Sequence, residues 1–171
     1  QPNGWAFALD YVPGLVAKAI GEAVDYYKDS EEVDVAPWFY AIQYYGCSYD
    51  ISDNGKNGRS FDDLNAVKLY FKLAQLASAG RFPDGQRFSN ATTLSKARER
   101  FADALSGIAR ADENCVIKES TLPEAAGGWW HKYNYTDQMW CDGQYMGPAL
   151  LAQIINEYAD YSPISGNDWD M

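Results

Sequence analysis

Residues 127–148 combine the chain's only histidine with carboxylates and aromatic rings. Around His131 the stretch holds three of the six tryptophans, three tyrosines and two aspartates. Histidine and carboxylate side chains exchange protons with substrates near neutral pH, and flat rings with a polar tip suit sugar binding. The stretch therefore indicates a site for acid–base chemistry on a sugar. A tyrosine-rich helical core is the alternative, because 15% of all residues are aromatic.

Asp142 is the strongest candidate for a catalytic acid. A helix that begins near Thr136 would place four side chains on the face of Asp142: Gln138, Met139, Tyr145 and Met146. Burial among two thioethers and a phenol disfavours the charged carboxylate. Such a carboxyl group can hold a proton near neutral pH and deliver it to a substrate. The expected helix also places Asp142 too far from its start for a capping role.

The other candidate residues each have a structural alternative. His131 follows two glycines, which allow a sharp turn, and the flat rings of Trp129 and Trp130. A lone histidine is more often structural than catalytic, and paired tryptophans are more often part of a core. Asp62 and Asp63 are adjacent, so only one of them can face inward. The charge of the other suits the first turn of a helix.

Apolar residues at helical spacing predict an all-α fold of about five helices, with almost no strand pattern. The expected helices cover residues 12–27, 37–47, 60–77 and 90–110, and a last one from about 136 that Gly147 and Pro148 interrupt. The expected irregular segments are 52–60, 78–90 and 111–136. Helices joined in this way favour antiparallel hairpins, and long ordered loops at helix ends often build sites.

One apolar stripe on each helix is expected to face the core. On the first helix the stripe is Val12, Leu15, Val16, Ala19, Ile20, Ala23, Val24 and Tyr27. On the later helices the stripes are Leu64, Val67, Phe71, Ala74 and Ala77, then Leu94, Ala97, Phe101, Leu105 and Ile108, then Leu151, Ile154, Ile155 and Tyr158.

The charge and the cysteines exclude several classes of function. A net charge of -10 argues against nucleic acid and anionic membranes, and an anionic substrate would need a local cluster of donors. Cys47, Cys115 and Cys141 are odd in number and lack a CxxC motif, so we expect buried free thiols without a disulfide framework or zinc site. Neither metal-ligand spacing nor a phosphate-binding glycine motif is present, so no metal and no cofactor are expected.

The chain has no apolar run of about 18 residues, so no membrane span is expected. It begins with Gln1 and not with methionine, which is typical of a removed signal peptide or a trimmed sequence. We therefore expect a periplasmic or extracellular protein, with a cytoplasmic location as the alternative.

Two parts of the aromatic stretch together resemble a known signature. Residues 129–132 and 138–146 are similar to the Trp-x-His-Lys and Gln-Met-Trp-x-Asp-Gly-x-Tyr-Met motifs of unsaturated glucuronyl and rhamnogalacturonyl hydrolases, glycoside hydrolase families 88 and 105. Residues 11–20 and 62–73 also resemble early helices of the rhamnogalacturonyl type. The chain departs from the usual pattern at four positions, which are Thr136, Asp137, Cys141 and Gln144.

The resemblance implies an (α/α)6 barrel with the active site in its mouth. It implies hydration of the double bond of 4,5-unsaturated galacturonic acid at the end of pectin (rhamnogalacturonan) fragments, which differs from ordinary two-carboxylate hydrolysis. Asp142 matches the aspartate that protonates the double bond and activates water, and Asp62 is the second aspartate, with Asp63 as the fallback. The implied substrate-binding residues are His131 and Lys132 at the uronate, with Trp129, Trp140, Tyr145 and Gln138 around the sugar.

Six helical hairpins need roughly 300 to 400 residues, which exceeds this chain. We therefore expect residues 1–171 to be the N-terminal part of a single barrel domain, inactive alone, with the C-terminal half as its missing partner. A half barrel would expose an apolar surface. The alternatives are a non-catalytic carbohydrate-binding barrel and a different (α/α)6 enzyme such as an epimerase, which would rely on several histidines.

Overall fold

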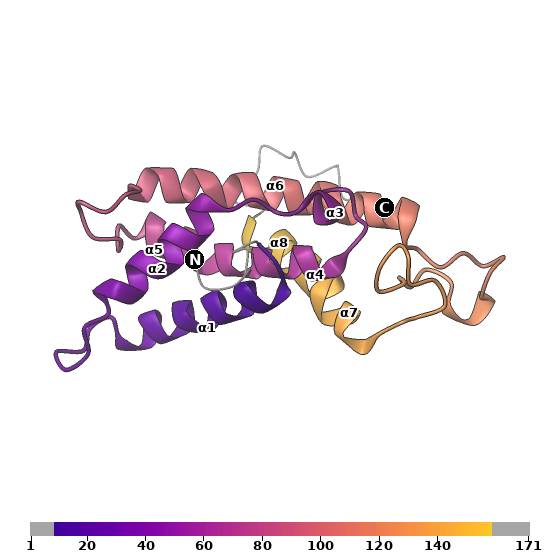
Figure 1. Ribbon diagram of the computed structural model, residues 1–171, viewed down its shortest axis with the longest axis horizontal. Helices are drawn as coiled ribbons and strands as arrows, with labels where there is room; N and C mark the ends of the chain where they lie inside the picture. The colour runs from indigo at the N-terminus through magenta and orange to yellow at the C-terminus, as the bar shows by residue number, and fades with distance from the viewer. Residues whose placement is uncertain (1–8, 159–171) are drawn as a thin grey trace, which may run out of the picture.

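The computed structural model describes residues 9–158, and the regular elements in this range are all helices (Figure 1). The elements are α1 (Tyr11–Tyr27), α2 (Ala36–Ser48), α3 (Asp53–Lys56), α4 (Phe61–Asn65), η1 (Ala66–Lys68), α5 (Leu69–Ser78), α6 (Asn90–Asn114), η2 (Pro123–Ala125), α7 (Cys141–Met146) and α8 (Pro148–Tyr158). The β-type pairs described are isolated bridges and not strands. The predicted all-α class is confirmed.

The helices form antiparallel pairs around one core. The hairpins α1/α2 and α5/α6 pack against each other, and α8 packs on α6 (Figure 1). The consecutive elements α4, η1 and α5 make one helical run through the centre, residues 61–78. One end of the molecule gathers the start of α4, the short helix α3, the last turn of α6, the segment 115–140 and α7 (Figure 1). This end carries most of the predicted site residues.

The central helical run confirms its predicted stripe. Its five stripe residues are all buried: Leu64, Val67, Phe71, Ala74 and Ala77. Ser60 is the N-cap residue of α4, as its place in the sequence predicts, but its side chain makes no capping hydrogen bond. The long helix α6 begins with a side-chain cap, in which Ser89 accepts a hydrogen bond of 3.1 Å from the backbone of Thr92. It continues four residues beyond the predicted end at 110, to Asn114.

The predicted inward face of α1 is only partly right, because Val24 is buried and Ile20 packs on the core, whereas the stripe residues of the first turns are exposed. The residues of α1 that are buried are small ones apart from a valine: Gly14, Ala17, Gly21 and Val24. A Cβ atom at Gly14 would lie 2.5 Å from the Cβ of Ala66, so only small residues allow α1 to approach the central run this closely. The larger apolar side chains on the other side are exposed and define the α1 apolar face: Tyr11, Val12, Leu15 and Val16.

One predicted loop and one predicted helix start need correction near the site end. Segment 52–60 contains the helix α3, and Ser52 caps α3 by accepting a hydrogen bond of 3.3 Å from Gly55. The last helical segment begins at Cys141 and not near 136, although the predicted interruption at Gly147 and Pro148 is confirmed by the separate helices α7 and α8.

Some side-chain predictions also change. Cys47 and Cys115 are buried as predicted, but Cys141 is exposed. Of the stripe predicted for the last helix, Ile154 is buried and Ile155 is exposed. Leu150, which was not in the predicted stripe, is buried in the core. The side chain of Tyr158 lies outside the described residues. Within residues 9–158, no helix combines the length and the apolar character needed to cross a bilayer.

Gly58 offers a sharp test of the site end of the fold. Its φ is +66°, and a Cβ atom there would lie 2.3 Å from the backbone nitrogen of Ala111. We expect Gly58→Ala to lower the free energy of unfolding by about 3 kcal/mol or more, because strain and a backbone clash add. Urea denaturation measures this loss. Gly80 is the matched control, since its φ is +65° with nothing within 4 Å. Gly80→Ala should lose only about 1–2 kcal/mol, and equal losses for the two variants would contradict the clash.

Candidate active site

The imidazole of His131 lies between two carboxylates from separate helices. Only 2% of the residue is exposed. Its Nε2 atom is 3.1 Å from Oδ1 of Asp62 on α4, and its Nδ1 atom is 3.4 Å from Oδ1 of Asp142 on α7. Lys132 Nζ pairs with the other oxygen of Asp62. The name His131 cluster is used below for five residues, which are His131, Asp62, Asp142, Lys132 and Trp140.

Backbone hydrogen bonds bring His131 to the start of α4. Segment 115–131 folds back on itself, with Ile117 N donating to Gly128 O at 2.7 Å and Trp130 N donating to Cys115 O at 2.9 Å. The next residues then pair with the chain before α4, through a bridge between Ser60 and Lys132 and a bond of 3.0 Å from Tyr133 N to Arg59 O. His131 is therefore held at Asp62 by the backbone on both sides of it.

Segment 132–140 forms turns, although the sequence pattern predicted a helix from about residue 136. His131 N donates to Gln138 O at 3.1 Å, and this bond closes a compact loop. Asp137 has a φ of +69°, which no residue of an α-helix adopts. A helix therefore cannot run through residue 137, and α7 begins at Cys141, after the N-cap residue Trp140. The acidic residue in the first turn of this helix is Asp142.

The expected apolar enclosure of Asp142 is wrong. Its side chain is 45% exposed. Gln138 and Met139 precede the helix, so they do not share its face. Of the other two expected neighbours, Met146 is buried and Tyr145 is exposed. Asp142 instead has one oxygen near the imidazole, lies in the first turn of α7, and is open to solvent on its other side.

Trp140 forms an open aromatic surface beside Asp142. Its ring stacks on the imidazole of His131 with centroids 4.3 Å apart and planes at 13°, yet the residue is 44% exposed. Its indole nitrogen donates to the side-chain oxygen of Gln138 at 3.2 Å. Tyr135, which the sequence pattern did not single out, lies 5.9 Å from Trp140 and completes the aromatic group.

Two of the predicted substrate-binding residues have other neighbours. Trp129 packs edge-on against Phe61 at 5.8 Å and donates its indole N–H to Asp112 at 3.0 Å, so it is part of the packing under the site. Tyr145 lies over the amine of Lys68 at 3.0 Å from ring centroid to Nζ. Lys68 was not predicted as a site residue, although a lysine beside Val67 in an apolar stripe is an unusual signal.

The structure distinguishes the two adjacent aspartates of α4. Asp62 faces His131, whereas Asp63 is half-buried against α3, where a Cβ atom on Gly55 would lie 2.6 Å from the Cβ of Asp63. Burial raises the pKa of Asp63, and a hydrogen bond with Ser52 partly opposes this rise. Of the two, Asp62 is the residue that belongs to the His131 cluster.

The His131 cluster combines one fixed carboxylate with one open carboxyl group. Asp62 holds both His131 and Lys132, and its hydrogen bond raises the pKa of Lys132, which therefore keeps its positive charge. The Nδ1 atom of His131 makes no hydrogen bond, so Asp142 keeps its oxygens available to a ligand. Within the described part of the chain, no group of three or more histidine, cysteine or acidic side chains is arranged to hold a metal ion.

Comparison with known proteins gives one match. The family described as Glycosyl Hydrolase Family 88 matches residues 3–163, which is nearly the whole chain. Neither the curated proteins nor the solved structures gave a match.

The pair of Asp62 and Lys132 makes stability depend on pH. A raised lysine pKa stabilises the fold below the ordinary value of 10.5, and this contribution disappears as the pH rises through the raised pKa. We expect Asp62→Asn to lower the free energy of unfolding by about 1 kcal/mol at pH 8 and by less near pH 11. Urea denaturation across this range measures the difference.

The control for this prediction is Asp29→Asn, which removes the exposed pair with Arg81 at 3.9 Å. Its effect should stay within a few tenths of a kcal/mol at every pH. A loss in Asp62→Asn that does not shrink at high pH would show that Lys132 is not its cause.

Proposed function

The chain belongs to glycosyl hydrolase family 88, and we propose that within this family of (α/α)6-barrel glycosidases it releases 4,5-unsaturated galacturonic acid from pectin fragments. The substrate class is the unsaturated oligosaccharides that lyases leave when they cleave rhamnogalacturonan. One observation carries the proposal, namely that Asp62 and Asp142 flank a single buried imidazole from two separate helices.

The proposed reaction is the hydration of a vinyl ether. The carboxyl group of Asp142 gives its proton to C4 of the double bond, and positive charge develops at C5 and the ring oxygen. The resulting carboxylate takes a proton from water, whose oxygen bonds to C5. The hemiketal at C5 then opens the ring, and the aglycone leaves from C1. One residue therefore acts first as acid and then as base.

The substrate itself supplies the environment that Asp142 lacks in the free protein. A sugar ring seated on Trp140 would cover the exposed side of the carboxyl group and exclude water from it. Both this burial and the negative charge of the uronate favour the protonated form of a carboxyl group. Lys132 beside Asp62 is the cation that can face the uronate, which an acidic protein otherwise repels, whereas the buried His131 would act by holding Asp62.

The exposure of Asp142 also favours a second candidate, a non-catalytic carbohydrate-binding protein of the same fold. Such a protein needs the open aromatic surface of Trp140 but no proton donor. A lysine or arginine paired with Asp142 would support this candidate, and none forms such a pair among residues 9–158.

Loss of the ultraviolet absorbance of the double bond tests the proposal. With an unsaturated rhamnogalacturonan disaccharide and the full-length protein, we expect Asp142→Asn to reduce kcat by about 100-fold to 10,000-fold, because it removes the proton donor. Asp62→Asn should also reduce kcat. The neighbouring Asp63→Asn is the matched control and should keep most of the activity, since Asp63 faces α3.

The outcomes separate the two candidates. A wild-type protein that binds the disaccharide but never consumes the double bond would support the non-catalytic candidate. Absence of both binding and turnover would overturn the proposed substrate class.

A further inference from the structure

Lys68 is a buried lysine at the centre of the fold. The residue is 4% exposed and ends η1. Its Nζ atom donates a hydrogen bond to the backbone carbonyl of Tyr145 and lies 3.0 Å from the centroid of the Tyr145 ring. Among the described residues, no carboxylate forms an ion pair with Lys68. A buried ammonium group held only by one carbonyl and one ring is rare, because burial strongly disfavours an isolated charge.

The position of Tyr145 explains what the lysine does. The last four carbonyls of a helix lack partners within it, and Tyr145 is in the last turn of α7. Pro148 begins α8 and has no N–H to offer to these carbonyls. The carboxyl end of a helix also carries partial negative charge, which a cation stabilises. Lys68 supplies both the missing donor and the cation at the junction of α7 and α8.

This contact joins the same two elements as the His131 cluster. Lys68 and Asp62 lie on one helical run, and Tyr145 and Asp142 lie on α7. The same elements also meet at their ends, because a Cβ atom on Gly147, the C-cap residue of α7, would lie 2.7 Å from Cε1 of Phe61, the first residue of α4. Lys68 therefore contacts the carboxyl end of the same helix whose first turn holds Asp142.

We propose that Lys68 is a positioning residue that holds α7 so that Asp142 stands beside His131 and opposite Asp62. The importance of this position for catalysis rests on the proposed function. The position itself is a property of the fold and can be measured separately.

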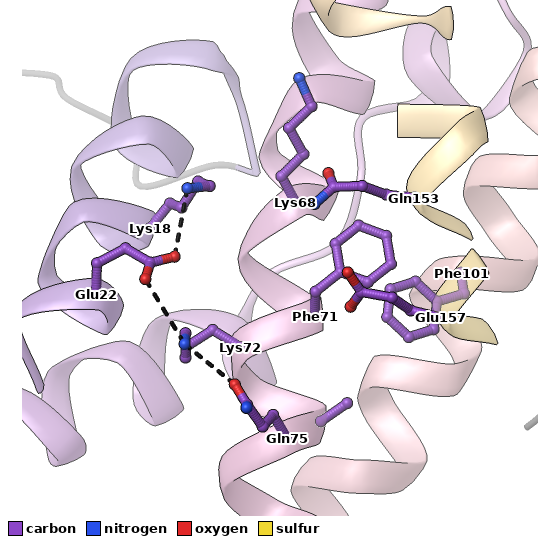
Figure 2. Close-up of a pocket in the computed structure, with 10 residues that line it drawn as sticks. Lys18, Glu22, Lys68, Phe71, Lys72, Gln75, Phe101, Gln153 and Glu157 are labelled. Atoms are coloured by element: carbon purple, nitrogen blue, oxygen red, sulfur yellow. Dashed lines mark hydrogen bonds and ion pairs between the residues drawn. The ribbon is translucent and has the colours of Figure 1, made fainter. Parts of the chain in front are cut away.

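The surroundings of Lys68 explain why its charge depends on pH. A cavity of about 470 Å³ lies beside it between α1, α5, α6 and α8 (Figure 2). The charged groups there are Lys18 and Glu22 of α1, Lys72 of α5 and Glu157 of α8. Glu22 pairs with both other lysines, at 3.4 Å and 3.6 Å, and Figure 2 shows the amine of Lys68 directed away from this network.

Burial, and then the charge of Lys18, lower the pKa of Lys68 to about 8. Because this value is below the ordinary 10.5, the buried charge opposes folding below pH 8, and stability rises as the pH increases from 8 to 10.5. The charge of Lys68 therefore does not serve global stability, which agrees with a local positioning role.

The single histidine gives a direct measurement of the position of α7. Trp140 is the N-cap residue of α7 and stacks on His131, so its ring current shifts the imidazole proton signals upfield in NMR spectra. In Lys68→Met we expect these signals to move downfield, toward those of an unstacked imidazole. The matched control is Lys72→Met, which removes a lysine one turn further on that lines the same cavity, and it should leave the signals unchanged. Thermal unfolding confirms that both variants are folded.

Activity gives the second measurement, with the unsaturated disaccharide as the probe. A displacement of about 1 Å at a reacting group can reduce turnover by up to about 100-fold, so Lys68→Met should lower kcat by about 10-fold to 100-fold. The wild-type kcat should decline above about pH 8, as Lys68 loses its charge. Lys68→Arg should keep activity and move this decline to higher pH, whereas Lys72→Met should keep both activity and profile.

The outcomes separate Lys68 from the proposed function. A wild-type protein without turnover overturns the proposed function, while the histidine signals still test the position of α7. The role of Lys68 is overturned if folded Lys68→Met has the same histidine signals and the same pH profile of kcat as the wild type. If Lys68→Met does not fold, the wild-type protein provides the test. The role of Lys68 is then overturned if the histidine signals of the wild type do not move downfield between pH 7 and 9.

Discussion

The fold at the site end depends on the buried imidazole of His131. A buried polar ring needs partners, and the Nε2 atom finds one in Asp62 of α4, while the Nδ1 atom faces Asp142 of α7 without a hydrogen bond. The chain must therefore bring three separate segments into register around one side chain. The backbone pairing of segment 115–140 with Arg59 and Ser60 sets the distance between His131 and Asp62. In the proposed role of Lys68, its contact with Tyr145 sets the distance between His131 and Asp142. Chemistry and packing share the same small set of contacts.

Close approach of backbones makes this register possible. Gly58 lets the chain before α4 touch α6, and Gly147 lets the junction of α7 and α8 rest on Phe61. Gly14 does the same for α1 against Ala66. The cost of this last contact is visible on the other side of α1, because a helix that buries its small residues presents its larger ones outward. The α1 apolar face is thus a direct consequence of how tightly α1 packs.

The sequence predicts features that depend on local pattern and misses those that depend on distant contacts. The stripe of residues 61–77 and the break at Gly147 and Pro148 follow from spacing and from the chemistry of proline, and both are confirmed. The start of α7 is set by the bond from His131 N to Gln138 O and by the backbone of Asp137, which no periodicity reveals. The misplaced start also explains the wrong burial of Asp142, since the burial was inferred from that helix.

In the proposed reaction, the exposure of Asp142 means that the cover of its carboxyl group must come from the substrate and not from the protein. A protein with a net charge of -10 gains little from burying one more carboxyl group, and it instead concentrates His131 and Lys132 beside Asp62. In the proposed reaction, a uronate bound near these groups would oppose ionisation of the adjacent carboxyl group. An open carboxyl group at a well-positioned helix start is therefore compatible with acid catalysis, provided that α7 keeps it within reach of the sugar.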